Sequence, residues 1–270
     1  MQVNRMPARA GWKWVIEGFG LLRRHPLALL GLTVLFLFTI VLPTVIPVLG
    51  GFAPLLLTPA LSVGYMQAVR TAESGRMPTP WTLYDGLRAQ KGRGARPLLM
   101  LGLINCLLTV AVLAFTMVAD GGTLFRIATG AIAADDPALG ERGLVFAAVV
   151  FLMLYTPVQM AMWYAPVFVA WHRLSPVQAL FYSLVGVWRN KGAFMLYMTG
   201  WFGVAVALSV AVQIAKPLLP GSLLPLFLSP LSLIMLSALY CSFWPSYRDV
   251  VTDGPAFGPG QAAGEAPPAA

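Results

Sequence analysis

Long apolar segments fill almost the whole chain between Leu27 and Trp244, and the charged residues stand in the connections between them. A helix needs about 20 apolar residues to cross the hydrocarbon of a bilayer, because each residue advances it by only about 1.5 Å. Six segments have this character: 27–47, 52–69, 98–118, 144–170, 193–215 and 223–244. The sequence therefore predicts an all-α fold, a polytopic transmembrane helical bundle with six spans.

The composition agrees with a lipid environment. Hydrophobic residues make up 58% of the 270 residues and charged residues 10%, with a mean hydropathy of +0.76, which leaves too little polar surface for a soluble domain. The formal net charge of +8 does not favour nucleic acid as a partner, since the basic residues lie beside apolar spans, where anionic lipid headgroups are nearer. Cys106 and Cys241 fall within predicted spans and are interpreted as structural thiols.

The first two spans form one apolar run that prolines interrupt. A single helix over 27–69 would be about twice too long for a bilayer, and Pro43, Pro47 and Pro54 break it. A tight hairpin is therefore expected. The second span is short and contains Pro59, so a re-entrant loop is the alternative for that segment.

Lysine and arginine are unevenly distributed between the connections. Five precede the first span, six lie between the second and third, three between the fourth and fifth and one follows the sixth, whereas the remaining connections hold three. The positive-inside rule then places both termini in the cytoplasm. The predicted domains are a cytoplasmic amphipathic interfacial helix over 1–26, the membrane domain over 27–244 and a cytoplasmic, mostly disordered tail over 245–270, where Gly, Pro and Ala dominate from Asp253 onward.

Three amphipathic segments precede the odd-numbered spans and indicate a repeat. The first contains Lys13 on its polar side, and the others begin at Thr79-Pro80 and Ser175-Pro176, where a hydroxyl cap precedes a proline suited to the first helical position. Ser175 with Gln178 also fits a capping box. Interfacial helices on the cytoplasmic side, each followed by a hairpin whose second span contains prolines, would give a three-hairpin pseudo-repeat. The alternative is that prolines are simply common in membrane helices.

The predicted spans contain no deep Asp, Glu, Lys, Arg or His, which disfavours a proton-driven pump. Their neutral polar residues suggest a cavity between proline-kinked helices, with interhelical hydrogen bonds as the alternative role. The candidate cavity residues are Asn105, Gln159, Tyr164 and Ser229. No metal-ligand spacing and no convergent set of acid, base and nucleophile stands out, so we expect no metal, no cofactor and no enzymatic activity.

Small residues recur every four positions in the fifth span. Gly203, Ala207 and Ala211 form part of this ridge, on which another helix can approach closely. Packing within one chain is one interpretation, and a homo-oligomer seam is the other.

Several stretches carry a family resemblance: Pro7 to Trp14, Arg23 to Leu27, Thr58 to Gly64, Ala165-Pro166 and Ala179 to Asn190. Over nearly its whole length the chain resembles an uncharacterised family of proteobacterial inner-membrane proteins. More remotely it is similar to YciC-type proteins and to the membrane portion of bacterial glycerophosphodiester phosphodiesterases, whose catalytic barrel has no counterpart here. The resemblance implies six helices, a bacterial inner membrane and work related to lipids, but no activity.

The favoured hypothesis is a non-enzymatic, multi-pass protein of the bacterial inner membrane whose basic cytoplasmic face engages anionic lipid headgroups, in envelope or lipid homeostasis or assembly. The candidate headgroup contacts are Lys13, Arg23, Arg24, Arg93, Arg96, Arg189 and Lys191. The alternative is a small transporter or exporter that moves its kinked helices around the neutral polar cavity. The sequence does not specify a small-molecule ligand.

Overall fold

The computed structural model describes residues 2–46, 50–88, 95–128, 131, 142–217 and 224–252, and most of them are helical. The elements in chain order are β1 (Gln2–Val3), α1 (Ala10–Arg24), α2 (Pro26–Val41), the 3-10 helix η1 (Leu42–Val45), α3 (Ala53–Glu73), the 3-10 helix η2 (Pro80–Tyr84), α4 (Asp85–Arg88), α5 (Arg96–Asp120), α6 (Thr123–Ala128), α7 (Arg142–Met162), α8 (Ala165–His172), α9 (Pro176–Arg189), α10 (Lys191–Ala215), α11 (Leu224–Val250) and β2 (Val251–Thr252). The all-α prediction is confirmed.

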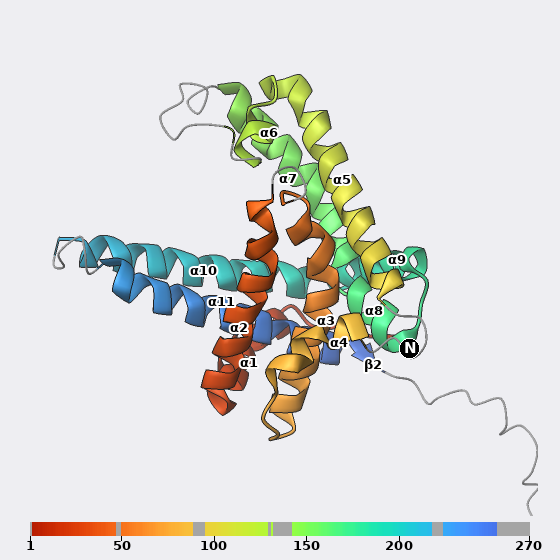
Figure 1. Cartoon of the computed structure of the whole chain (residues 1–270), viewed down its shortest axis with the longest axis vertical. Helices are drawn as coiled ribbons and strands as arrows, with labels where there is room; N and C mark the ends of the chain where they lie inside the picture. The colour runs from red at the N-terminus through yellow and green to blue at the C-terminus, as the bar shows by residue number, and fades with distance from the viewer. Residues whose placement is uncertain are drawn as a thin grey trace, which may run out of the picture.

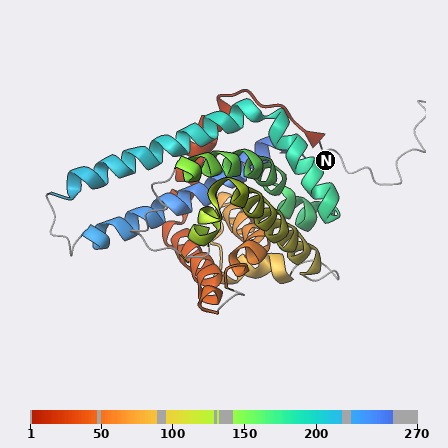
Figure 2. The ribbon, with the colours of Figure 1, turned by 90° about the horizontal axis from the view of Figure 1, so that it is seen from above.

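Three helical hairpins extend from a common base. The base is the region where α1, α8 and the C-terminal halves of α3 and α11 pack together. The hairpins are formed by α2 with α3, α5 with α7, and α10 with α11 (Figure 1). Figures 1 and 2 show that the α5/α7 and α10/α11 hairpins leave the base in different directions, so their tips lie far apart. The hairpins therefore meet at the base and separate from one another toward their tips.

Five helical stretches are long and apolar enough to cross a membrane: Pro26–Val45, Arg96–Val118, Gly143–His172, Lys191–Ala215 and Leu228–Val250. The predicted second span also forms a continuous helix, α3, which passes through Pro59 and ends at Glu73. Its Thr58, Ser62 and Gln67 make it less apolar than the other five. An α-helical membrane protein is thus confirmed, whereas a membrane crossing by α3 stays a prediction.

Residues 245–252, which follow the predicted last span, form regular structure. α11 does not end at residue 244 but continues through Pro245 to Val250. Val251 then pairs with Val3, and Thr252 with Gln2, in a short antiparallel sheet. Residues 245–252 of the predicted tail therefore belong to the folded base, and 253–270 lie outside the described residues.

The starts predicted for the amphipathic segments agree with the structure. Ser175 Oγ accepts from the backbone N–H of Gln178, and Gln178 Oε1 accepts from the N–H of Ser175, so the capping box at the start of α9 is confirmed. The second segment begins at Pro80, as the 3-10 helix η2 followed by the short α4. Among the described residues, α9 packs mainly on α7 and α8, while η2 and α4 pack on α3.

The first amphipathic helix, α1, is far more enclosed by protein than an interfacial helix would be. It packs along α11 and α10, and Trp14 and Val15 are almost completely buried. Two other apolar residues of α1, Trp12 and Ile16, are exposed, with 49% and 55% of their surface accessible. The apolar residues of α1 are therefore shared between the protein core and the outer surface.

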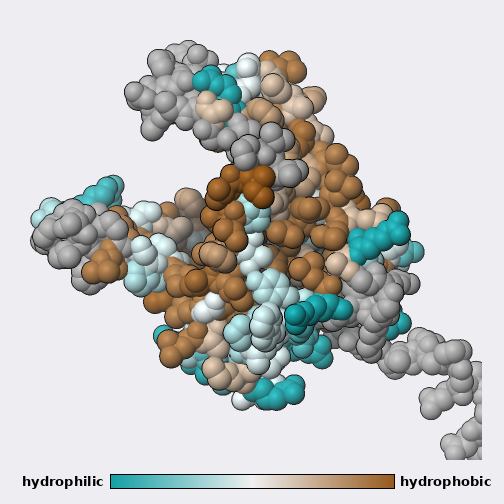
Figure 3. Space-filling view, in the orientation of Figure 1, coloured by the Kyte–Doolittle hydropathy of each residue, from teal (hydrophilic) through white to brown (hydrophobic). Residues whose placement is uncertain are grey.

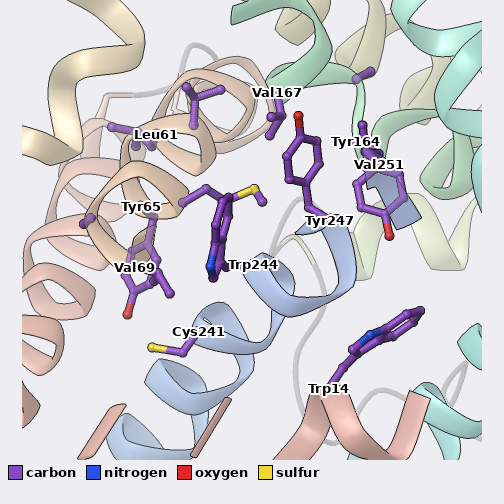
Figure 4. Packing of buried hydrophobic residues seen from close by; sticks show 14 of the residues in the cluster. Trp14, Leu61, Tyr65, Val69, Tyr164, Val167, Cys241, Trp244, Tyr247 and Val251 are labelled. Carbon is purple, nitrogen blue, oxygen red and sulfur yellow. The ribbon is translucent and has the colours of Figure 1, made fainter. Parts of the chain in front are cut away.

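The core lies where the C-terminal half of α11 meets α1, α3 and α8. Figure 4 shows Trp244 and Tyr247 of α11 between α3, which contributes Leu61, Tyr65 and Val69, and the region of Tyr164 and Val167. Neutral hydrogen bonds cross the same interfaces. They join Thr33 to Tyr65 (2.8 Å), Ser237 to Thr33 (2.7 Å) and Tyr197 to Ser242 (2.6 Å). Such pairs satisfy polar groups that have no water partner in an apolar core.

Asn190, between α9 and α10, holds the N-terminal segment against the base. Its Oδ1 accepts from the N–H of Met6 at 2.7 Å, and its Nδ2 donates to the carbonyls of Asn4 and Gly186, both at 2.9 Å. The Asn190 residue itself is 1% exposed. This one side chain therefore binds the carbonyl of Asn4 and the N–H of Met6, next to the backbone hydrogen bond from the Asn4 N–H to the carbonyl of Val250.

We expect Asn190→Ala to release this segment. A net hydrogen bond contributes about 1 kcal/mol, so the loss of these contacts should speed exchange of the Val3 and Met6 amide hydrogens by about tenfold or more, as measured by hydrogen–deuterium exchange. Gln178→Ala, which removes only part of the α9 cap, is the control. Unchanged exchange in Asn190→Ala would show that the β1–β2 pairing alone holds the segment.

Candidate functional site at the base of the hairpins

A group of charged side chains joins three helices at the base. Arg248 of α11 contacts three carboxylates: its Nη1 lies 2.5 Å from Glu73 Oε1, and its Nη2 lies 2.8 Å from Glu17 Oε2 and 3.1 Å from Asp249 Oδ1. Glu17 belongs to α1 and Glu73 ends α3. One guanidinium therefore connects α1, α3 and α11, which come from the two ends of the chain and from the first hairpin.

Two tryptophans donate to the same carboxylates. Trp244 Nε1–H donates to Glu73 Oε2 at 2.6 Å, and Trp14 Nε1–H donates to Asp249 Oδ2 at 3.0 Å. Burying an indole against a carboxylate satisfies both the N–H donor and part of the negative charge. These contacts fix the orientation of each carboxylate toward the guanidinium.

Lys13 adds a second cation beside Glu17 and Asp249. Its Nζ lies 3.3 Å from Glu17 Oε1 and 3.8 Å from Asp249 Oδ2. Every carboxylate of the group therefore meets at least two donors, which compensates the cost of partial burial. We call this set the Arg248 cluster: Lys13, Trp14, Glu17, Glu73, Trp244, Arg248 and Asp249.

Further basic side chains connect the cluster to its neighbours. Arg24 Nη1 donates to the backbone carbonyl of Glu73 at 2.6 Å. The Arg70 guanidinium carbon lies 5.5 Å from the ring centroid of Trp171 on α8 and 5.7 Å from that of Trp244, within the range of a cation–π interaction. The second hairpin is thus tied to the cluster through α8.

The carboxylates of the cluster are paired with cations. Glu17 and Asp249 also line a cavity of about 570 Å³ beside α1. Among the residues that the structure describes, no three His, Cys, Asp or Glu side chains are placed to hold a metal ion. The cluster therefore joins α1, α3 and α11 through paired charges.

The basic residues predicted to contact headgroups lie on several helices. Arg93 lies outside the described residues; the other predicted contacts are all exposed, namely Lys13, Arg23, Arg24, Arg96, Arg189 and Lys191. They occupy the ends of α1, α5, α9 and α10 at the base. Figure 3 shows hydrophobic side chains over the hairpins and hydrophilic ones toward the base. Only Lys13 is shared with the Arg248 cluster.

The structure does not bring the four predicted cavity residues together. Asn105 of α5 is buried, and its Nδ2 donates to a backbone carbonyl of α3 at 3.4 Å. Tyr164 is also buried, and its hydroxyl donates to the carbonyl of Ser246 at 3.1 Å. Ser229 is exposed on α11, while Gln159 faces a groove on another part of the molecule. A single neutral vestibule, which the transporter hypothesis requires, gains no support from these positions.

The groove that contains Gln159 lies between α7 and α10. Its volume is about 530 Å³. Its lining is mainly apolar and comprises Leu152, Tyr155, Thr156, Gln159, Met160, Trp163, Val187, Lys191, Phe194, Met195, Met198 and Thr199. Lys191 is the charged member of this set. The groove opens between two of the diverging hairpins.

The predicted oligomer ridge is exposed on α10. Gly203, Ala207 and Ala211 all lie on the accessible surface, and a Cβ atom added to Gly203 would meet no other described atom within 4 Å. The ridge is thus not used for packing within the described part of the chain. A seam with a second copy stays a prediction.

Sequence reasoning missed the acidic half of the cluster. The local sequence pattern predicts no partner for Glu17, Glu73, Arg248 or Asp249. A signal was present, because acidic residues are rare: Asp and Glu number only 10 against 18 Lys and Arg. When acidic residues are few and basic residues many, each acidic side chain is more readily found in an ion pair than exposed without a partner. Only the folded structure identifies the partners.

Comparison with known proteins gives one informative relative. The chain is 39% identical over 251 residues to a protein of Burkholderia thailandensis (strain E264) named "Probable inner membrane protein BTH_II0599", and the match covers 92% of this chain and 93% of that protein. No family model and no solved structure matches.

Proposed function

Since the chain belongs to the family of this Burkholderia inner-membrane protein, we propose that it is a non-enzymatic inner-membrane protein whose basic face engages anionic lipids. The role would be a lipid-binding scaffold in envelope or lipid homeostasis or assembly. The more distant resemblance to YciC-type proteins and to phosphodiesterase membrane portions stays a prediction.

One observation carries the proposal: three acids at the base are paired with one arginine, and other arginines are not. Glu17, Glu73 and Asp249 all contact Arg248, whereas Arg23, Arg96 and Arg189 are exposed. The outer rim of the base is therefore positive although acidic residues are close by. Each cation near an anionic membrane surface contributes about 1 kcal/mol of attraction.

The proposed topology has six crossings, with both termini in the cytoplasm. It is supported by the β1–β2 pairing, which holds the two ends of the described chain together. The positive-inside rule assigns the basic base to the cytoplasm. α3 would cross the membrane in addition to the five more apolar stretches, and α5, η2 and α4, which pack on it, would shield it from lipid. Reporter fusions at the two termini test this arrangement, and opposite locations would refute it.

The lipid proposal predicts a loss of lipid selectivity when charge is reversed at the rim. In the triple variant R23E/R96E/R189E, the enrichment of phosphatidylglycerol over phosphatidylcholine around the protein should fall by at least about fivefold, the factor that corresponds to about 1 kcal/mol. Lipid-class mass spectrometry after mild solubilisation from mixed vesicles measures this ratio.

Lys216→Glu is the matched control, because Lys216 is exposed at the far end of α10. It should leave the enrichment of phosphatidylglycerol over phosphatidylcholine unchanged. Equal lipid profiles for the wild type, the triple variant and the control would remove the proposal. Thermal unfolding of each variant verifies that the fold is intact.

A further inference from the structure

We propose that the groove between α7 and α10 holds an acyl chain of an anionic glycerophospholipid, with the lipid phosphate at Lys191. This deepens the proposed function, on which it rests, by assigning one defined lipid site beside the general rim of basic residues. The proposed ligand is one lipid molecule. The site would select it by the negative charge of its headgroup and by the length of its acyl chain.

The walls of the groove match an acyl chain. Apart from Val187 of α9, they come from the two apolar stretches Gly143–His172 and Lys191–Ala215, which are long enough to cross a membrane. The α10 residues of the lining run from Lys191 to Thr199, a distance of about 12 Å along a helix. The volume of about 530 Å³ lies within the range of about 300–1,000 Å³ that is usual for ligand sites.

The groove exists because the hairpins diverge. Trp163 touches Phe194 at the base, with ring centroids 5.5 Å apart, whereas Leu152 and Met195 are 65% and 72% exposed. The side chains on the two walls of the groove are therefore too far apart to fill the space between them. In a membrane, an apolar opening of this kind gains dispersion contacts only when hydrocarbon enters it.

The charge at the base end of the groove selects the headgroup. Lys191 lines this end, and its Nζ lies 5.2 Å from the ring centroid of Trp188, an exposed aromatic residue of the type found at headgroup depth. In the part of the chain that the structure describes, no acidic residue lines the groove. A chain-shaped ligand with an anion at one end therefore complements the groove better than a neutral lipid does.

The N-terminus of α10 reinforces the positive potential at Lys191. Within the described chain no side chain caps this helix, because Asn190, at the N-cap position, is bound to the N-terminal segment instead. The first N–H groups of a helix carry partial positive charge and attract phosphate. Lys191 occupies the first position of α10, so both contributions act at the same place.

Gln159 supplies an independent sign of a polar ligand atom. It lines the groove and is only partly exposed, and its amide makes no hydrogen bond to another described residue. An amide without a partner in hydrocarbon is costly. A lipid ester carbonyl that enters beside the acyl chain would accept from its NH₂ group.

Photocrosslinking at the groove tests the proposal directly. In full-length protein inserted into vesicles of equal phosphatidylglycerol and phosphatidylcholine, p-benzoylphenylalanine replaces Met198, which lines the groove, or Val206, which is exposed on α10 outside it. Mass spectrometry of the adducts should show phosphatidylglycerol favoured at least fivefold at position 198, whereas position 206 should report the bulk ratio.

Substitution of Lys191 then identifies the headgroup contact. In the Met198 crosslinking background, Lys191→Glu should return the adduct ratio to the bulk value and Lys191→Arg should preserve the preference. A bulk ratio at position 198 in the wild type would overturn the proposal. A covalent protein dimer at position 198 would also overturn it, because a second copy would then fill the groove.

The triple variant R23E/R96E/R189E separates this inference from the proposed function. If its total lipid selectivity falls while the ratio at position 198 is at the bulk value already in the wild type, the rim proposal stands and the groove proposal fails. If position 198 favours phosphatidylglycerol but charge reversal at the rim leaves the total lipid selectivity unchanged, the groove proposal is supported and the rim proposal fails. Helical circular dichroism and a monodisperse elution profile establish that each variant is folded.

Discussion

Replacing Arg248 by methionine is expected to lower the free energy of unfolding by about 2–3 kcal/mol. The change leaves the carboxylates of Glu17, Glu73 and Asp249 facing one another without their shared cation. Removing one partner of a buried ion pair costs about 3–5 kcal/mol, and we expect less here because the Arg248 side chain is 35% exposed and water screens part of the charge. Equilibrium unfolding in mixed micelles of dodecyl maltoside and sodium dodecyl sulfate measures the change.

Two comparisons make this result specific to the cluster. Arg23→Met removes an exposed arginine near the end of α1 and should change stability little, as surface charges usually do. Arg248→Lys keeps the charge but has no planar fork to reach several carboxylates, so its stability should fall between those of the wild type and Arg248→Met. If Arg248→Met and Arg23→Met unfold alike, the cluster does not hold the hairpins together.

A single methyl group at Gly11 is expected to separate α1 from α10. A Cβ atom at this position would collide with the carbonyl oxygen of Ala193 and would come within 2.7 Å of the backbone nitrogen of Tyr197. Both obstacles are backbone atoms of a helix, so no side chain can turn away to make room. Gly11→Ala should therefore destabilise the protein by about 1–3 kcal/mol, the usual cost of overpacking a core, as measured by the same unfolding experiment.

Gly20 on the same helix provides the matched control. An added Cβ atom there meets no described atom within 4 Å. Gly20→Ala should leave stability unchanged or raise it by up to about 1 kcal/mol, because alanine favours the helix over glycine. A loss of stability of similar size in both variants would contradict the close approach of α1 to α10.

The sequence gives a good account of the elements that depend on local pattern. Apolar length predicted five helical stretches that are long enough to cross a membrane, and the Ser175 capping box predicted the start of α9. Both signals are contained in a few consecutive residues. The end of α11 was predicted less well, because Pro245 suggests a stop whereas the packing of Tyr247 and Val250 in the core continues the helix to Val250.

The sequence by itself determined that the chain is apolar and helical and which connections are basic, because hydropathy, helix caps and charge counts act over neighbouring residues. Only the tertiary structure decided that α1 packs on the last hairpin and that Glu17, Glu73 and Asp249 meet at Arg248. Glu17 and Arg248 are separated by 231 positions, and no local preference specifies such a pair. Their meeting follows from how the hairpins converge at the base, and the same divergence away from it opens the groove beside Lys191.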